Sequence, residues 1–217
     1  MTPTRIRARR GEGELLHAEI VAATARLLAE TGDESAVSIR AIADAVGVTP
    51  PSIYLHFPDK TALLFAVCED RFQALDQRLE DAARDATDPL DELHRRGAAY
   101  VRFGLENPEH YRILFMDRDE PISFSEERMT DAAAFTHMVE AVQRAIDAGV
   151  LAVGDGATAT DAMTATIALW ASAHGLTSLL IAKPDFPWPS INELIDQVLR
   201  AAVYGLLRAG ADAGSGA

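Results

Sequence analysis

The stretch from Ser38 to Lys60 limits the possible fold more than any other part of this sequence. It begins with Ser38, a residue type that caps helix N-termini. Gly47 can adopt the left-handed conformation that ends a helix, and Val48 places an apolar side chain under that turn. Between Ser38 and Gly47, apolar residues recur at the three- and four-residue spacing of a short amphipathic helix: Ile39, Ile42, Ala43 and Val46.

A second short helix is expected directly after this turn. Thr49 can cap it, and Pro50 and Pro51 suit a first turn whose N–H groups have no partner within the helix. Ile53 and Phe57 are four residues apart and predict a buried contact on one helix face. The outward face is then formed by Thr49, Ser52, Tyr54 and His56. Two short helices joined by a glycine turn are typical of a helix-turn-helix motif, whose second helix enters the DNA major groove.

The same stretch carries a family resemblance. It contains, in this order, Ile42-Ala43, Gly47-Val48, Ile53-Tyr54, Phe57-Pro58, Lys60 and Ala62-Leu63-Leu64. This order resembles the DNA-binding domain of the TetR family of repressors, and the resemblance is dense over residues 15–65. It implies that the second short helix reads the major groove and that Lys60, at a helix start, meets a phosphate. It also implies that Tyr54 and His56 lie near the sugar-phosphate backbone. Together with the motif's other positions, the candidate DNA-binding residues are Ser38, Arg40, Thr49, Pro50, Pro51, Ser52, Tyr54, His56 and Lys60.

The charge is unevenly distributed along the chain. The formal net charge is −13, but residues 1–60 hold 7 Arg and Lys against 8 Asp and Glu, while residues 61–217 hold 13 against 25. An acidic body disfavours nonspecific adhesion to a polyanion, so we expect DNA binding to depend on a local cationic surface. Its candidates are Arg5, Arg7, Arg9, Arg10, Arg40 and Lys60. The basic N-terminal arm of residues 1–13 is either a solvated tail or an arm that follows the minor groove.

Length and periodicity predict an all-α protein of about nine helices. A chain of 217 residues suits a small domain followed by a larger one. We expect a three-helix DNA-binding domain in residues 1–60, a helical ligand-binding and dimerisation domain in residues 61–209, and a disordered tail in residues 210–217. The expected helices outside the motif cover residues 14–31, 60–84, 89–106, 108–115, 128–148, 162–182 and 190–209, with a loop at 117–127.

The helix expected at residues 162–182 contains no Asp, Glu, Lys or Arg. Its length could span a bilayer, but interspersed Thr, Ser and His residues and the lack of flanking basic clusters argue against a membrane. We therefore expect it to be buried on every side. One face is smooth and suits a partner helix: Thr164, Ala168, Ala171, Gly175, Ser178 and Ala182. The other carries chemical groups and suits an interior or a cavity: Trp170, His174, Thr177 and Ile181.

A weaker resemblance covers this second half. The spacing of Trp170, His174 and Gly175 is similar to the WHG subgroup of TetR-type C-terminal domains, which dimerise through their last two long helices. The residues expected at a homodimer interface are Ala168, Ala171, Gly175, Ser178, Ile195, Val198, Ala202 and Gly205. His174 is either a ligand contact or a buried core residue with satisfied hydrogen bonds.

An aromatic set in the second half is the candidate ligand site. It comprises Tyr100, Phe103, Tyr111, Phe115, Phe135, Met138, Trp170 and His174. Such residues line either an apolar cavity with a few polar groups or a solid aromatic core, and both interpretations stay open.

The sequence favours a sequence-specific DNA-binding transcriptional regulator, a dimeric repressor released by a small apolar ligand. The alternative is a small-molecule-binding helical protein or enzyme that uses the second-domain cavity. There is no nucleophile elbow, HExxH motif, paired Cys or phosphate loop, so we expect no enzyme activity and no cofactor. The six His residues lack metal-ligand spacing, and the single Cys68 is expected to be a core thiol. No secretory signal is recognised, so we expect a cytoplasmic protein whose partners are an operator, the ligand and a second copy.

Overall fold

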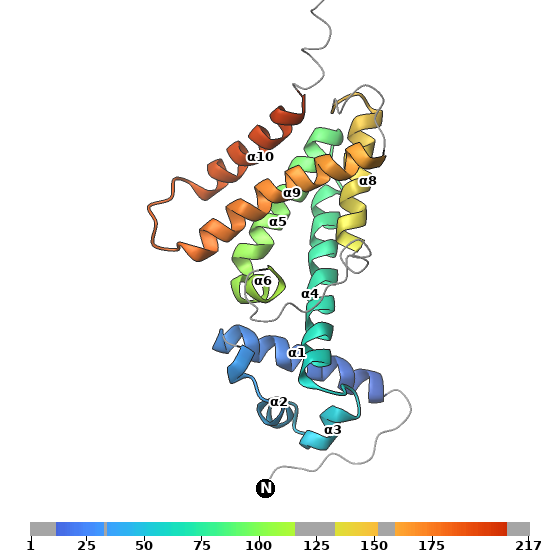
Figure 1. The fold of residues 1–217 in the computed structure, drawn as a ribbon, viewed down its shortest axis with the longest axis vertical. Helices are drawn as coiled ribbons and strands as arrows, with labels where there is room; N and C mark the ends of the chain where they lie inside the picture. The colour runs from blue at the N-terminus through green and yellow to red at the C-terminus, as the bar shows by residue number, and fades with distance from the viewer. Residues whose placement is uncertain (1–11, 33, 116–132, 152–158, 208–217) are drawn as a thin grey trace, which may run out of the picture. The chain divides into compact units, whose positions relative to one another are not determined.

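The computed structural model describes residues 12–32, 34–115, 133–151 and 159–207. Within these ranges the chain is all-helical, with no strand, as the sequence predicts (Figure 1). The helices are α1 (Glu12–Thr31), α2 (Ile39–Val46), α3 (Pro50–Tyr54), α4 (Lys60–Ala83), α5 (Pro89–Glu106), α6 (Pro108–Phe115), α8 (Ala133–Asp147), α9 (Ala159–Ala182) and α10 (Ile191–Leu207), with a 3₁₀ turn at Glu34–Ala36. Residues 1–11 of the expected N-terminal arm, the loop at 117–127 and the C-terminal tail lie outside the described residues, and α1 begins at Glu12, two residues earlier than expected.

The chain divides into two compact units, and the division runs through α4. The first unit contains residues 1–72 and 107–123, and the second contains residues 73–106 and 124–217. Helix α6 therefore belongs with α1, α2 and α3, and it packs against α1. The boundary at residue 60 that the sequence suggests stays a prediction.

The first unit is built around one apolar core. Ile20 from α1, Ile42 from α2, Ile53 from α3 and Leu63 from α4 are all completely buried (0% exposed). Phe57, just after α3, is 4% exposed. The buried contact expected from the spacing of Ile53 and Phe57 is confirmed, because both side chains belong to this core.

The turn between α2 and α3 has the predicted geometry. Gly47 has φ 78° and ψ 33°, the left-handed region in which a residue with a Cβ is strained. The N–H groups of Gly47 and Val48 each donate to the Ala43 carbonyl at 2.9 Å, which satisfies the end of α2. Val48 packs against the core below the turn. The sharp change of direction therefore results from a single glycine.

Of the two caps that the sequence predicts in the motif, the one at Ser38 forms and the one at Thr49 does not, while Asp59 caps the start of α4. Ser38 Oγ accepts from the Ala41 N–H at 3.1 Å, and Asp59 Oδ1 accepts from the Ala62 N–H at 2.7 Å. Thr49 occupies the N-cap position of α3, but its side chain makes no capping bond. A capping side chain at Thr49 would accept from the N–H of residue 51 or 52. Pro51 has no N–H, and the Ser52 N–H donates instead to the Thr49 carbonyl at 2.8 Å. The Thr49 hydroxyl instead pairs with Ser52 Oγ at 3.0 Å.

The second unit is organised around α9, which packs against α5, α8 and α10. Its core contains Ala141, Val142 and Ala145 from α8, each 0% exposed, together with Ala165 of α9 and Leu93 of α5. The small alanine side chains let the backbones of neighbouring helices approach closely.

The two faces of α9 separate as the sequence predicts. Thr177 and Ile181 are buried, whereas Thr164, Ala168 and Ala171 are exposed. Residues Asp161–Ala182 form a helix long and apolar enough to cross a membrane, and 44% of its most apolar window is buried. Length and composition are weak evidence, since the core helix of a soluble protein passes the same test. The expectation that α9 is buried on every side is not met within this chain, because Ile167 is 48% exposed and Leu179 is 54% exposed. This exposed apolar surface still needs a cover.

Gly97 on α5 tests a close contact between α5 and α10 in the second unit. A Cβ on Gly97 would lie 2.8 Å from Leu199 Cδ2 on α10 and 3.0 Å from its Cδ1. We expect Gly97→Val to lower the free energy of unfolding by roughly 1–3 kcal/mol through overpacking, measured by urea denaturation. In a Leu199→Ala background the added cost should shrink, because the colliding methyl groups are gone. Equal costs in both backgrounds would contradict this account.

Candidate functional sites

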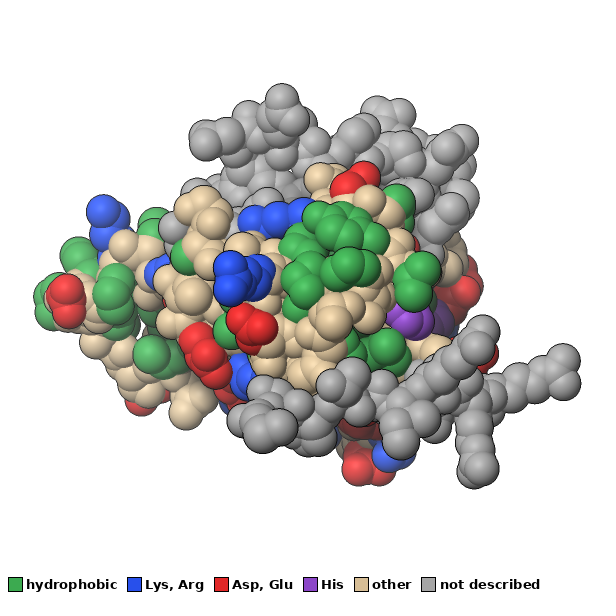
Figure 2. All heavy atoms as spheres, turned by 90° about the horizontal axis from the view of Figure 1, so that it is seen from below, with side chains coloured by type: hydrophobic (Ala, Val, Ile, Leu, Met, Phe, Trp, Pro, Cys, Tyr) green, Lys and Arg blue, Asp and Glu red, His purple; other side chains and the backbone are tan. Residues whose placement is uncertain are grey.

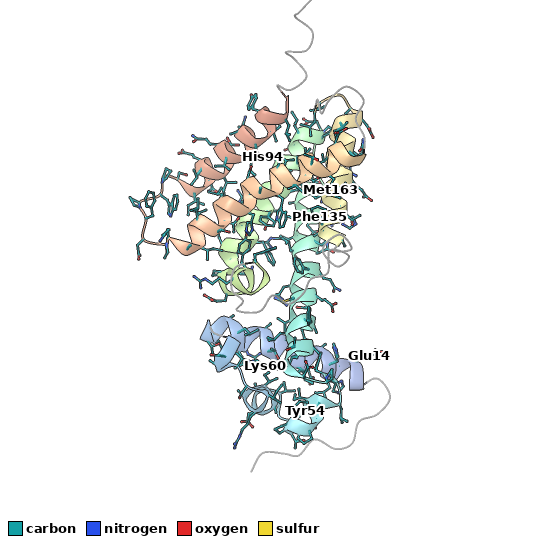
Figure 3. The ribbon with its side chains drawn as sticks, in the orientation of Figure 1. Glu14, Tyr54, Lys60, His94, Phe135 and Met163 are labelled. Carbon is teal, nitrogen blue, oxygen red and sulfur yellow. The ribbon has the colours of Figure 1, made fainter. Side chains whose placement is uncertain are left out.

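The residues expected to bind DNA lie together on α2, α3 and the start of α4. Ser38 and Arg40 are exposed at the beginning of α2, and Tyr54 at the end of α3 is 53% exposed. Figure 3 labels Tyr54 and, at the beginning of α4, Lys60. The other members are exposed or half-buried: Thr49, Pro50, Pro51, Ser52 and His56. Burial of Ile53 and Phe57 on the opposite side turns these side chains outward.

Lys60 carries the positive charge at the N-terminus of α4. One N–H of this helix start is already used, because Asp59 accepts from Ala62. The attraction of this helix start for a phosphate therefore depends more on the Lys60 ammonium than on free N–H groups. On α2, Arg40 and Asp44 are four residues apart and both exposed, so the charge of this surface is mixed. Affinity for a polyanion must come from a few well-placed cations.

The structure adds two residues to this surface that the sequence analysis missed. Leu55, directly after α3, is 86% exposed. The inward positions Ile53 and Phe57 lie two residues to either side of it and could have indicated its outward direction. His17 of α1 stacks on Phe57 with ring centroids 4.5 Å apart and lies 6.1 Å from the His56 ring. Its position against α3 is a product of packing and has no local sequence signal.

The exposed side chains at this end combine apolar and basic character. Figure 2, which views the molecule from below, shows hydrophobic side chains gathered in a patch with both basic and acidic side chains at its border. Exposed apolar groups can contact thymine methyl groups or sugars, while bases are read and phosphates bound by polar and cationic groups. A surface that combines apolar and charged side chains can contact both the bases and the phosphates of a nucleic acid.

In the second unit, three polar aromatic side chains form a hydrogen-bonded chain. Trp170 Nε1–H donates to the Tyr100 hydroxyl at 3.0 Å, which leaves the hydroxyl hydrogen for His174 Nδ1 at 3.3 Å. With its own proton on Nε2, the His174 ring can donate to Ser178 Oγ at 3.4 Å. Phe135 of α8, labelled in Figure 3, meets the Trp170 ring edge to face at 6.3 Å. This cluster joins α5, α8 and α9.

The cluster favours a neutral imidazole. Burial lowers the pKa of His174, since the charged ring would lose part of its hydration. Tyr100 is 8% exposed and Phe103 is 7% exposed, while Phe135, Met138, Trp170 and His174 are half-buried. These six residues of the predicted ligand site belong to one unit and can share one environment.

The other two residues of the predicted ligand site belong to the first unit. Tyr111 is 1% exposed and its ring lies 4.8 Å from that of Phe115 on the same helix, α6. Phe115 in turn meets Phe72 of α4 edge to face at 5.8 Å. Both aromatic rings thus have packing partners within their own unit. A single site that includes all eight residues stays a prediction.

The residues predicted for a homodimer interface differ in exposure. Ala168, Ala171 and Gly205 are exposed, and Gly175, Ser178, Val198 and Ala202 are half-buried. Ile195 is 2% exposed and therefore supports α10 from inside the chain. Further apolar side chains on the same two helices are exposed: Ile167 (48%), Leu179 (54%), Ile191 (43%) and Tyr204 (60%).

Comparison with protein families gives two matches that together cover most of the chain. Residues 93–208 match the family described as "Tetracyclin repressor-like, C-terminal domain". Residues 20–67 match the one described as "Bacterial regulatory proteins, tetR family". The first match covers more than half of the chain and the second contains the whole of α2 and α3.

Among curated proteins, similarity extends over about half of the chain. The nucleoid occlusion factor SlmA of Vibrio campbellii is 29% identical over 113 residues, which are 52% of this chain and 56% of that protein. This chain thus spans about half the length of the curated relatives it matches.

Solved structures resemble the fold over a larger part of the chain. A Rhodococcus sp. RHA1 protein of unknown function is 25% identical, with a TM-score of 0.74 over 89% of this chain and 96% of its own. A TetR family transcription regulator of Marinobacter aquaeolei VT8 is 20% identical, with a TM-score of 0.69 over 91% of this chain and 98% of its own.

The lowered pKa of His174 predicts a pH dependence of stability. The unfolded imidazole, near pKa 6.5, binds a proton more readily than the folded one. The contribution of this group is therefore complete above pH 6.5 and is lost as the pH falls towards the lower folded pKa. We expect His174→Gln to reduce the decline in the free energy of unfolding over this range, measured by urea denaturation at a series of pH values. Parallel pH profiles for wild type and variant would contradict a neutral buried His174.

Proposed function

Because this chain belongs to the TetR family of bacterial regulators, we propose that it is a dimeric transcriptional repressor released from its operator by a small, mainly apolar ligand. The family membership makes it a DNA-binding transcription regulator. Repression, the ligand and the dimer are the proposed parts. A regulator of this kind acts in the cytoplasm, where its operator is.

The observation that carries the proposal is the outward face of α3. Gly47 turns the chain, Ile53 holds the helix to the core at 0% exposure, and Tyr54 remains 53% exposed. A helix that is anchored on one side and polar or aromatic on the other can enter a major groove without unfolding. Pro50 and Pro51 have no N–H, so base contacts from these two residues would be apolar.

The proposed ligand site is the aromatic cluster of the second unit. Tyr100, Trp170 and His174 supply polar groups in mostly apolar surroundings, the usual makeup of a small-molecule site. A ligand with one polar group could replace a member of this hydrogen-bonded chain. The spacing of Trp170, His174 and Gly175 also supports placement in the WHG subgroup.

Release from DNA requires that the ligand prefer one state of the protein. A ligand can shift an equilibrium only by the difference in its affinities for the two states. Helix α4 is the proposed lever, because it is continuous from Lys60 to Ala83 and contributes to both compact units. Movement of its second-unit half would be transmitted along the helix to Lys60.

Two substitutions separate phosphate contact from base reading. We expect Lys60→Ala to weaken binding to every DNA sequence and to reduce the slope of log affinity against log salt by about one unit. Ser52→Ala should change sequence preference, because Ser52 is on the outward face of α3. Gel shifts on the gene's own upstream DNA and on random DNA measure both effects.

Lys183→Ala is the matched control, since Lys183 is the other lysine of the chain and lies in the second unit. It removes the same charge and should leave DNA affinity unchanged. Equal losses on cognate and random DNA for the Ser52 variant would contradict base reading by the outward face of α3. A wild type that fails to shift its upstream DNA would contradict the proposed operator.

A second pair of variants tests the proposed homodimer through α9 and α10. Within the chain, a Cβ on Gly175 would meet nothing within 4 Å. Gly175→Leu should therefore fold as a monomer but clash with a partner helix, at roughly 1–3 kcal/mol for each of the two interface positions. Light scattering at micromolar concentration should show a wild-type dimer and a variant shifted towards monomer.

Gly13→Leu is the control for this test. A Cβ on Gly13 also meets nothing within 4 Å, but Gly13 is on α1 of the first unit, outside the proposed interface. It should remain a dimer. A monomeric wild type, or a Gly175 variant as dimeric as the control, would contradict the proposed interface.

A further inference from the structure

Three potential metal ligands from two helices meet in the second unit. Asp76 and Glu80 are four residues apart on α4 and so share one helix face. His137 of α8 reaches both, with Nδ1 2.9 Å from Asp76 Oδ1 and 3.5 Å from Glu80 Oε1. One ligand atom of each residue lies within 4.8 Å of those of the other two. Small side-chain rotations would bring all three atoms to bonding distance of one ion, about 2.0–2.2 Å.

We propose that Asp76, Glu80 and His137 bind a divalent transition-metal ion of the Zn²⁺ type. One imidazole nitrogen with two carboxylate oxygens is a ligand set suited to such ions, whereas Mg²⁺ and Ca²⁺ prefer oxygen ligands alone. Three protein ligands leave room for water to complete the coordination. The three proposed metal ligands are not members of the aromatic cluster, so the two sites share no residue.

The electrostatics of the site favour a cation. The hydrogen bond to Asp76 raises the pKa of His137 against the opposing effect of burial, and the charges of Glu80 and Glu140 raise it further. Three carboxylates thus act on one imidazole. A metal ion bound by Asp76, Glu80 and His137 would replace the imidazole proton as the positive charge that balances the carboxylates.

Arg96 is the group that opposes a metal here. It is 4% exposed, and its NH1 donates to Glu80 Oε1 at 2.7 Å. Its Nε also donates to Glu92 Oε1 at 3.1 Å, so part of its charge is balanced elsewhere. The repulsion between this guanidinium and a metal ion weakens binding, so we expect a modest affinity rather than a permanently occupied site.

Water and metal can reach the three side chains. Their exposed fractions are 18% for Asp76, 40% for Glu80 and 39% for His137. Glu80 also lines an open surface pocket of about 400 Å³, together with Glu92 and Arg96 among others. Hydrated ions can therefore enter without local unfolding, and water can occupy the remaining coordination positions.

Calorimetric titration of the metal-free full chain with Zn²⁺ tests the proposal. We expect one saturable site per chain, with affinity reduced at least about tenfold by Asp76→Asn and by His137→Gln. Zn²⁺ should also raise the melting temperature of the wild type but not of these variants, because a ligand stabilises only the state that it binds. EDTA should reverse the effect, and Mg²⁺ should not reproduce it.

Asp81→Asn is the matched control, since it removes the same charge from the neighbouring position of the same helix without touching the ligand set. It should bind Zn²⁺ as the wild type does. A second measurement needs no variant: Co²⁺ added to the wild type should shift the NMR signals of the His137 ring and leave those of His17 and His56 in place.

The absence of a saturable Zn²⁺ site in the wild type would overturn the proposal. So would wild-type affinity in both ligand variants, or Co²⁺ shifts at other histidines only. None of these measurements involves DNA or the proposed effector, so their failure would leave the proposed function unaffected.

Discussion

The left-handed backbone at Gly47 is the constraint on which the presentation of α3 depends. At φ 78° the chain leaves α2 and enters α3 within a few residues, so Ile42 and Ile53 can both be completely buried in one core. A tight turn keeps the two helices side by side, so the apolar side chains of both are removed from water in the same core. With Ile53 fixed inward, Tyr54 and Leu55 must point outward, at 53% and 86% exposure. The shape of the proposed DNA-binding surface is therefore a consequence of one glycine and the burial around it.

A different constraint organises the second unit. Helix α9 carries no charged side chain from Ala162 to Ala182 and has to be covered by α5, α8 and α10. Thr166 and Thr177, both 0% exposed, donate their hydroxyls to carbonyls one turn earlier, at 2.8 Å in each case. Buried hydroxyls on this helix are thus satisfied within the helix itself, and its packing surfaces behave as apolar. Tyr100, Trp170 and His174 bring a hydrogen-bonded chain of polar groups into these mostly apolar surroundings.

Charge in the second unit is arranged as a network between helices. Arg78 of α4 pairs with Glu106 of α5 at 2.5 Å, and Glu92 of α5 accepts from Arg144 of α8 at 2.6 Å. Burial acts to raise the pKa of Glu92, but hydrogen bonds from Arg144 and Arg96 outweigh it and the pKa is lowered. The guanidinium of Arg96 is buried and would be strongly destabilising without the carboxylates of Glu80 and Glu92. These acidic residues therefore have a structural role as well as contributing to the net charge.

The sequence alone determined what depends on neighbours a few residues apart. The Ser38 cap, the Gly47 turn, the Ile53 and Phe57 contact and the inward face of α9 all follow from backbone hydrogen bonding and helical period, which are local. Tertiary packing decided what joins distant segments. It placed Tyr111 and Phe115 with Phe72 in the first unit, buried Ile195 within the chain, and brought His137 to a carboxylate 61 residues away. No periodicity records such pairs, because which helices pack together depends on the shape and volume of whole faces.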